Sequence, residues 1–330
     1  MSRITQAAYV LLKQSPTPDQ ISASLDPQGL AITKHERGTD LLTAATASVV
    51  FEVPFQAENG SSVLIDVMNH RWVDTIDSND PVLFLSWHSG ALGHFAYPGC
   101  LERAIHECRT WPEVDEAVKN HTALLRLRVS YKEESDLERR ISAAGKQDLA
   151  FAEIVFLTKL LLVFASLPET LGYFLPGGEA LVSREMLPLV WQQYMKNEPP
   201  RPFDLWIAWM NRRLLRVPDE ADWAVIDTIG LHQLEMNDLE ACFQPVRYQP
   251  LQVANWLLDV ASYLYTNGPI IQDGHTLTGP GGINWQAHSY ESSLQFPPRS
   301  VLCLRPLDAA TLPQRLLKRL PIPPLPKRAE

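Results

Sequence analysis

The segment Thr122-Ala-Leu-Leu-Arg-Leu-Arg-Val-Ser-Tyr131 decides the fold class of this chain. Its apolar side chains at Leu125, Leu127 and Val129 alternate with the two arginines and the serine that lie between and after them. A period of two residues is typical of a β-strand, because successive side chains of a strand point to opposite faces of the sheet. The segment therefore predicts a strand with one apolar face and one polar face.

A long apolar stretch, Leu149 to Leu167, follows this strand. Glu153 and Lys159 lie inside it, and burying two ionisable groups in lipid is costly. The stretch therefore predicts a buried helix of a soluble protein rather than a membrane span. The apolar run near the start, Ile4 to Leu12, is interpreted as a first strand and not as a signal peptide, because Gln6 interrupts it and no cleavage site of small residues follows.

The remaining pattern mixes separate strands and helices. An Asn59-Gly60 pair lies between two strand-like runs and is typical of the tight turn of a hairpin. Predicted strands cover residues 47–53, 62–69, 203–211, 223–229 and 300–304, and predicted helices cover 19–25, 101–109, 113–119, 183–196 and 251–265. Because strands and helices do not alternate regularly, we predict an α+β fold with mixed or antiparallel sheets and packed helices.

The length and the breaks in the pattern indicate more than one folding unit. At about 150 residues per domain, 330 residues correspond to roughly two domains. We predict an N-terminal α+β subdomain at 1–117, a C-terminal α+β domain at 118–306 and a proline-rich tail at 307–330. From Thr311 onward the tail carries five basic side chains against one acidic side chain. It is expected to be disordered or to dock on the folded body through a helical turn at Leu316 to Leu320.

The composition excludes several classes of protein. Hydrophobic residues make up 45% of the chain, which is enough for a packed core and excludes a wholly disordered protein. The formal net charge of -9 disfavours a nucleic-acid partner, which requires basic side chains to neutralise phosphates, and disfavours docking on an anionic membrane. Four cysteines are too few for a disulfide scaffold, and we expect buried thiols in a cytoplasmic protein.

Motifs that would name a reaction are missing from the sequence. The Pro-Gly-Gly turns at 176–178 and 280–282 are neither a dinucleotide-binding fingerprint nor a phosphate-binding loop. The Gly-x-Ser-x-Gly elbow of an α/β-hydrolase is also missing, and the spacing of His88 and His94 matches no standard metal motif. We therefore predict no catalytic residue, no cofactor, no metal site and no small-molecule substrate.

Several segments of the second half follow one another in a recognisable order. They are the strand at His121, the apolar helix ending near Leu167, Phe203-Asp-Leu-Trp-Ile207, Asp227-Thr-Ile-Gly-Leu231 with Leu234-Glu235 and Asp238-Leu-Glu240 behind it, Asn267-Gly-Pro269, and Asp273-Gly-His-Thr276. This order resembles the bacterial family of domains of unknown function DUF4261 over most of residues 7 to 306. The resemblance implies no activity. It implies only a genomic setting rich in secretion and toxin genes.

The cluster Asp273-Gly274-His275-Thr276 allows two interpretations. Asp273 and His275 are two residues apart and could bind a metal or form an acid–base pair. Asp-Gly is also a preferred turn dipeptide between two strands, which is the simpler interpretation. The resembled family more often has a second acidic residue in place of His275, and this difference weakens a metal site.

The segment from Val217 to Phe243 is strongly acidic and contains no Lys or Arg. Its acidic residues are Asp219, Glu220, Asp222, Asp227, Glu235, Asp238 and Glu240. They could perform acid–base chemistry, bind a hard cation, present a negative surface to a basic partner, or form an ordinary solvated face. Because they are spread over a strand and its loops, we favour the negative surface among the functional interpretations and add Asp273 and His275 to it.

Three functional hypotheses follow from these observations. The first is a cytoplasmic immunity protein that neutralises a secreted bacterial toxin, delivered for example by type VI secretion, by covering its basic active site with an acidic surface. The second is a secretion-system accessory protein that loads an effector. The third is a metal-assisted enzyme that uses Asp227, Glu235, Asp273 and His275. The first two predict a basic protein toxin or effector as the partner.

Overall fold

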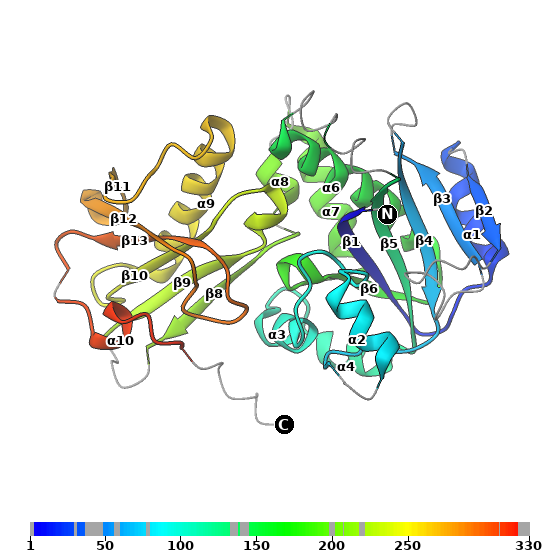
Figure 1. Ribbon diagram of the computed structural model, residues 1–330, viewed down its shortest axis with the longest axis horizontal. Helices are drawn as coiled ribbons and strands as arrows, with labels where there is room; N and C mark the ends of the chain where they lie inside the picture. The colour runs from blue at the N-terminus through cyan, green and yellow to red at the C-terminus, as the bar shows by residue number, and fades with distance from the viewer. Residues whose placement is uncertain are drawn as a thin grey trace. The chain divides into compact units, whose positions relative to one another are not determined.

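The computed structural model describes residues 3–29, 32–36, 49–55, 60–76, 80–132, 138, 145–197, 202–206, 208–217, 222–309 and 311–322. The chain divides into two compact units, Met1–Trp209 and Met210–Glu330 (Figure 1). Each unit contains one sheet with packed helices, and the predicted α+β class is confirmed.

The first unit is built on a seven-stranded antiparallel sheet in the order β2-β3-β4-β5-β1-β6-β7. Its strands are β1 Arg3–Leu12, β2 Thr33–Glu36, β3 Val49–Pro54, β4 Ser61–Met68, β5 Ala123–Tyr131, β6 Thr170–Leu175 and β7 Ala180–Ser183. The predicted hairpin of β3 and β4 is present, although residues 56–59 of its connection lie outside the described residues. The decisive strand β5 lies between β4 and β1 and is buried along its whole length.

Helices cover this sheet. They are α1 Pro18–Leu25, α2 Pro81–His88, α3 Cys100–Glu107, α4 Val114–Asn120, α6 Lys146–Val163, α7 Met186–Lys196 and α8 Pro202–Trp206. Helices α2, α3 and α4 share one core cluster with Tyr9, Leu124 and Phe174 of the strands. Helix α6 packs on β1 and β5, and Tyr131 of β5 donates a hydrogen bond to Glu153 of α6 at 2.6 Å.

Two polar side chains of β5 belong to a buried charged cluster. Asp66 of β4 lies opposite Arg126 of β5 in the antiparallel register. Its carboxylate accepts hydrogen bonds from Nη2 of Arg126 at 2.6 Å and from Nη2 of Arg128 at 3.1 Å. All three side chains are buried, so the polar face of the strand forms a charged cluster inside the first unit.

The predicted buried helix is present as α6. Residues Gln147–Ser166 are also long and apolar enough to cross a membrane by length and composition, and half of the span is buried within the protein.

The second unit is built on a six-stranded mixed sheet in the order β11-β12-β13-β10-β9-β8. Its strands are β8 Asn211–Arg216, β9 Ala224–Ile229, β10 Asp238–Phe243, β11 Thr276–Thr278, β12 Asn284–Tyr290 and β13 Val301–Pro306. Strands β10 and β13 are parallel, and the other neighbours are antiparallel. The long helix α9, Pro250–Asn267, packs on β9 and β10.

The described part of the tail belongs to the second unit. Helix α10, Gln314–Leu317, places Leu316 in a core cluster with Val225, Cys242 and Cys303 of the sheet, and Ile322 joins the same cluster. This is the docked helical turn that the sequence allowed. The boundary predicted at residue 306 is therefore wrong for residues 307–309 and 311–322.

Two further predictions differ from the structure. The domain boundary lies between Trp209 and Met210 rather than near residue 118, because β5 pairs with both β1 and β4 and therefore belongs to the first sheet. The strand predicted at 203–211 is the short helix α8, and β8 begins only at Asn211. Pro202 at the first helical position favours this start.

Candidate functional site

Three of the acids predicted to form a negative surface are inside the protein. Asp227 of β9 lies opposite Glu240 of β10 in the antiparallel register, and Asp238 lies two residues before Glu240 on the same strand. All three side chains have no exposed area. The interpretation of these residues as a partner-binding surface is therefore wrong. They form an acid–arginine network within the second unit.

Arginines from outside the acidic segment neutralise this network. Arg213 of β8 forms a two-pronged pair with Asp227, with Nε–Oδ1 at 3.0 Å and Nη2–Oδ2 at 2.5 Å. Arg299 donates from Nη2 to Asp227 Oδ2 at 2.6 Å and from Nε to Asp238 Oδ2 at 3.0 Å. Arg319 of the tail donates from Nη1 to Glu240 Oε2 at 2.7 Å. Charge-assisted bonds of this kind compensate for the cost of burying carboxylates.

The two acids of β10 differ in their protonation chemistry. Burial alone raises the pKa of Asp238, but a hydrogen bond from His232 and the charge of Arg299 outweigh it, so the pKa lies below its ordinary value. Leu231 N and Thr228 Oγ1 also donate to this carboxylate, at 3.0 and 2.9 Å. For Glu240 burial dominates over Arg319, and the pKa is raised. Neither carboxylate is accessible to a partner.

The other predicted residues are scattered over exposed loops. Asp222 precedes β9, and Glu235 lies in the connection between β9 and β10 with a left-handed φ of 58°. Asp273 and His275 are exposed just before β11. Residues Asp219 and Glu220 lie outside the described residues. Among the residues with a described position, no group of three His, Cys, Asp or Glu side chains could hold a metal ion.

The Asp273-Gly274 pair forms a turn, as the simpler interpretation predicted. Gly274 has a left-handed φ of 81°, and its N–H donates to the carbonyl of Ala287 at 2.8 Å. Asp273 Oδ1 accepts a hydrogen bond from Ser289 N at 2.9 Å, so the carboxylate ties the turn to β12. His275 Nδ1 accepts a hydrogen bond from Gln272 N at 3.3 Å.

His275 lines a groove that the sequence did not predict. The groove has a volume of about 430 Å³ and lies between α9 and the segment that leads into β11. Its walls are mainly apolar: Trp256, Asp259, Val260, Tyr263, Ile270, Ile271, His275, Thr276 and Leu277. The helical residues 256, 259, 260 and 263 are spaced by three and four, which places them on one face of α9. That spacing was the available sequence signal for the groove.

Polar groups in this groove are few and exposed. Asp259 is exposed on α9, and within the described part of the chain its carboxylate has no ion-pair or hydrogen-bond partner. Tyr263 is 50% exposed and Ile270 is 46% exposed. The groove therefore combines an exposed carboxylate with accessible aromatic and aliphatic surface.

Two tryptophans stiffen the wall of the groove. The rings of Trp256 and Trp285 have centroids 4.9 Å apart, and Trp285 is fully buried. A Cβ atom at Gly279 would approach Trp285 Cδ1 to 2.6 Å and Trp256 Cζ2 to 2.8 Å, which is too close. The glycine therefore lets both rings pack against the backbone that follows β11.

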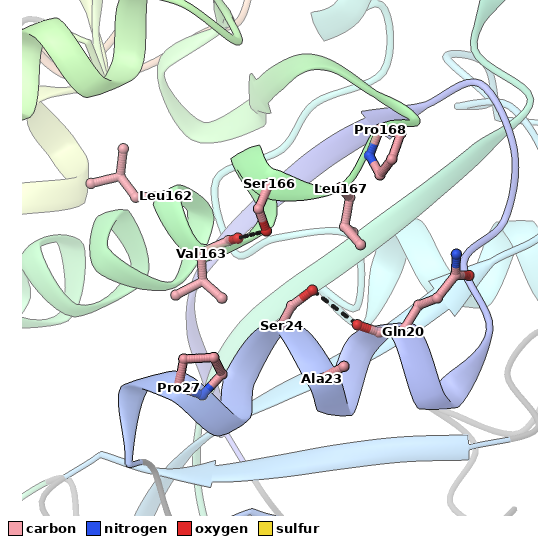
Figure 2. A pocket seen from close by; sticks show the side chains of 9 residues that line it. All are labelled: Gln20, Ala23, Ser24, Pro27, Leu162, Val163, Ser166, Leu167 and Pro168. Carbon is pink, nitrogen blue, oxygen red and sulfur yellow. Dashed lines mark hydrogen bonds between the residues drawn. The ribbon is translucent and has the colours of Figure 1, made fainter.

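A second pocket, in the first unit, lacks ionisable side chains. It has a volume of about 500 Å³ and lies between α1 and the end of α6 (Figure 2). Its lining residues are Gln20, Ala23, Ser24, Pro27, Leu162, Val163, Ser166, Leu167 and Pro168. Ser24 and Ser166 each donate to a backbone carbonyl of their own helical segment at 2.9 Å. The pocket therefore offers neither an acid nor a base, and the α9 groove is the stronger candidate site.

Comparison with known proteins finds a family model that matches one segment of the chain. The family model described as Domain of unknown function (DUF4261) matches residues 227–305. No curated protein and no solved structure matches the chain. The match is narrower than the resemblance over 7–306: it includes the motifs at Asp227, Asn267 and Asp273 and leaves out those at His121, Leu167 and Phe203. The segment that is similar to the family Domain of unknown function (DUF4261) thus includes the α9 groove and the buried acids Asp227, Asp238 and Glu240.

Proposed function

We propose that this chain is a binding protein for a basic protein partner, and that the partner is a bacterial toxin which the chain neutralises as an immunity protein. The observation that carries the proposal is the α9 groove. It presents accessible aromatic and aliphatic side chains beside the carboxylate of Asp259, which has no ion-pair partner among the residues that the structure describes. Exposed apolar surface with an aromatic anchor is typical of protein recognition sites.

The charge of the chain supports a basic partner. The first unit holds 18 Lys and Arg against 26 Asp and Glu, and the second holds 11 against 12. The acidic excess therefore belongs mainly to the first unit, whose formal charge is 18 - 26 = -8 against 11 - 12 = -1 for the second. A negative field accelerates the encounter with a basic protein. Asp259 then supplies a local contact for one Lys or Arg of that protein.

The contact surface for the partner is therefore the α9 groove and not the acidic surface that the sequence predicted. Asp227, Asp238 and Glu240 are buried and paired with arginines, so these three residues present no negative charge at the surface of the second unit. Of the residues predicted from the sequence, His275 lines the groove and Asp273 holds the adjacent turn. The metal-assisted alternative loses support because Arg213 and Arg299 occupy both oxygens of Asp227.

Protection of cells tests this proposal. The full chain is co-expressed with the product of the gene adjacent to its own, which is tested as the toxin, and growth is measured for the wild type, Tyr263→Ala, Asp259→Lys and Glu291→Lys. Glu291 is exposed in the same unit outside the groove, so Glu291→Lys is a control with the same change of charge. We expect protection by the wild type and the control, and loss of protection by the two groove variants.

The possible failures have different meanings. Killing that continues in the presence of the wild-type chain would contradict the immunity function. Protection by all four proteins would support the immunity function and show that the toxin does not bind at the α9 groove. If the wild type does not protect but its deletion abolishes export of the toxin, the secretion-accessory hypothesis replaces immunity.

A further inference from the structure

Strand β11 is an edge of the second sheet that is open on one side. Within the described residues it pairs only with β12, through Thr276 with Gln286, Leu277 with Trp285 and Thr278 with Asn284 (Figure 1). Beyond the end of the strand, Gly279 N donates to Ile283 O at 2.9 Å, so Gly279 and Ile283 form a hydrogen-bonded pair of this antiparallel ladder. Antiparallel pairs alternate between hydrogen-bonded and non-hydrogen-bonded, so the next hydrogen-bonded pair is Leu277 with Trp285.

The backbone groups on either side of Leu277 therefore point away from β12. These are the N–H and C=O groups of Thr276 and Thr278, and both residues are exposed. Unpaired backbone groups of an edge strand form a template onto which another extended chain can pair. The three residues of β11 thus provide two residues, Thr276 and Thr278, whose backbone groups can pair with a short extended segment.

The open edge borders the α9 groove. Thr276 and Leu277 line this groove together with Trp256, Asp259 and Tyr263 of α9. A polypeptide that pairs with β11 directs every second side chain to the same face. Side chains of one face would then contact Trp256 and Tyr263, and a basic side chain among them would reach the exposed carboxylate of Asp259.

We infer that the basic protein partner contributes an extended segment that adds to β11 as a further strand. The apolar side chains of this segment occupy the groove, and a Lys or Arg of the segment pairs with Asp259. The inference rests on the proposed function, because it specifies how the partner uses the same groove. Main-chain hydrogen bonds provide affinity in this mode, and the groove and the carboxylate provide specificity.

A peptide experiment on the full chain tests the inference without knowledge of the partner. A phage-displayed library of linear dodecapeptides is selected on the wild-type protein, and the enriched peptides are synthesised. Their affinities are measured for the wild type, Thr278→Pro and Thr278→Val. The proline removes the outward N–H and leaves the ladder bonds of Leu277 intact, whereas valine keeps that N–H with a similar side-chain shape.

We expect equal affinity for the wild type and Thr278→Val, and affinity lower by roughly tenfold for Thr278→Pro, which corresponds to one lost hydrogen bond. Asp259→Lys should weaken the enriched basic peptides as well. Thermal unfolding checks that Thr278→Pro is folded. Equal affinity for all proteins, or selection that enriches no peptide sensitive to Asp259→Lys, would overturn the inference.

A scan of the peptide itself gives a readout that does not depend on the folding of a variant. N-methylation of single peptide amides should abolish binding at alternate positions and be tolerated at the positions between them, because only alternate amides face β11. Tolerance at every position, or sensitivity with a period of three to four, would contradict strand addition. If Thr278→Pro still protects cells while Tyr263→Ala does not, strand addition fails and the proposed function stands.

Discussion

Arg299 donates a hydrogen bond from Nη2 to Oδ2 of Asp227 at 2.6 Å, and both side chains are almost fully buried. The same guanidinium donates from Nη1 to the carbonyls of Gln295 and Pro297, so it also holds the connection between β12 and β13. A buried charge with this many partners is costly to disturb, because removal of the arginine takes a charged partner from each of two buried carboxylates, Asp227 and Asp238.

We therefore expect Arg299→Met to lower the free energy of unfolding by about 3 to 5 kcal/mol. The matched control is Arg247→Met, because Arg247 pairs with Asp308 where the two side chains are 38% and 40% exposed. The control should cost about 1 kcal/mol or less. Urea unfolding followed by circular dichroism measures both variants. Equal losses for the two arginines would mean that the buried network does not stabilise the second unit.

Acid should destabilise the first unit through Asp66. Burial alone raises the pKa of this carboxyl, but Arg126 and Arg128 outweigh burial and hold the pKa below its usual value. The carboxyl is therefore more acidic in the folded protein than in the unfolded chain. Its contribution to stability is complete above the unfolded pKa of about 4 and is lost as the pH falls through the folded pKa.

The measurement is the melting temperature as a function of pH, compared between the wild type and Asp66→Asn. We expect the variant to be less stable near neutral pH and to show a shallower decline below about pH 4. Parallel profiles of the two proteins would exclude Asp66 as a source of the acid sensitivity. A variant of Asp238, whose pKa is also lowered, should behave in the same way in the second unit.

Two adjacent leucines of the tail should respond differently to truncation. Leu316 is fully buried in the core cluster of the second unit, whereas Leu317 is 45% exposed. We expect Leu316→Ala to cost about 2 to 5 kcal/mol and Leu317→Ala to cost less than about 1 kcal/mol. Chemical denaturation of the full chain measures both. Similar small effects would show that the tail does not dock on the sheet in solution.

The four cysteines should be unreactive in the folded protein. All four are buried, and the Sγ atoms of Cys242 and Cys303 lie 3.6 Å apart on neighbouring strands without a disulfide bond. Burial, together with the charges of Asp74 and Glu179, raises the pKa of the Cys100 thiol well above its usual value. A thiol reagent such as Ellman's should therefore label no cysteine before unfolding and all four afterwards. Rapid labelling of the native protein would contradict this burial.

The sequence determined the features that depend on neighbouring residues. The two-residue period at 123–131 and the long apolar run ending at Leu167 give β5 and α6, and the pair Asp273-Gly274 gives the turn before β11. These predictions succeed because strand, helix and turn preferences follow from the chain within a few residues. The α+β class follows from their order.

Only the tertiary structure decided which charges meet water. The acidic segment appears in the sequence as a negative surface, yet Arg213, Arg299 and Arg319 converge on its carboxylates from positions 14, 72 and 79 residues away from their partners. The α9 groove likewise needs a helix face and a strand edge that only the sheet order brings together. Ion pairing and burial depend on distance in space, whereas a pattern of residues records only distance along the chain.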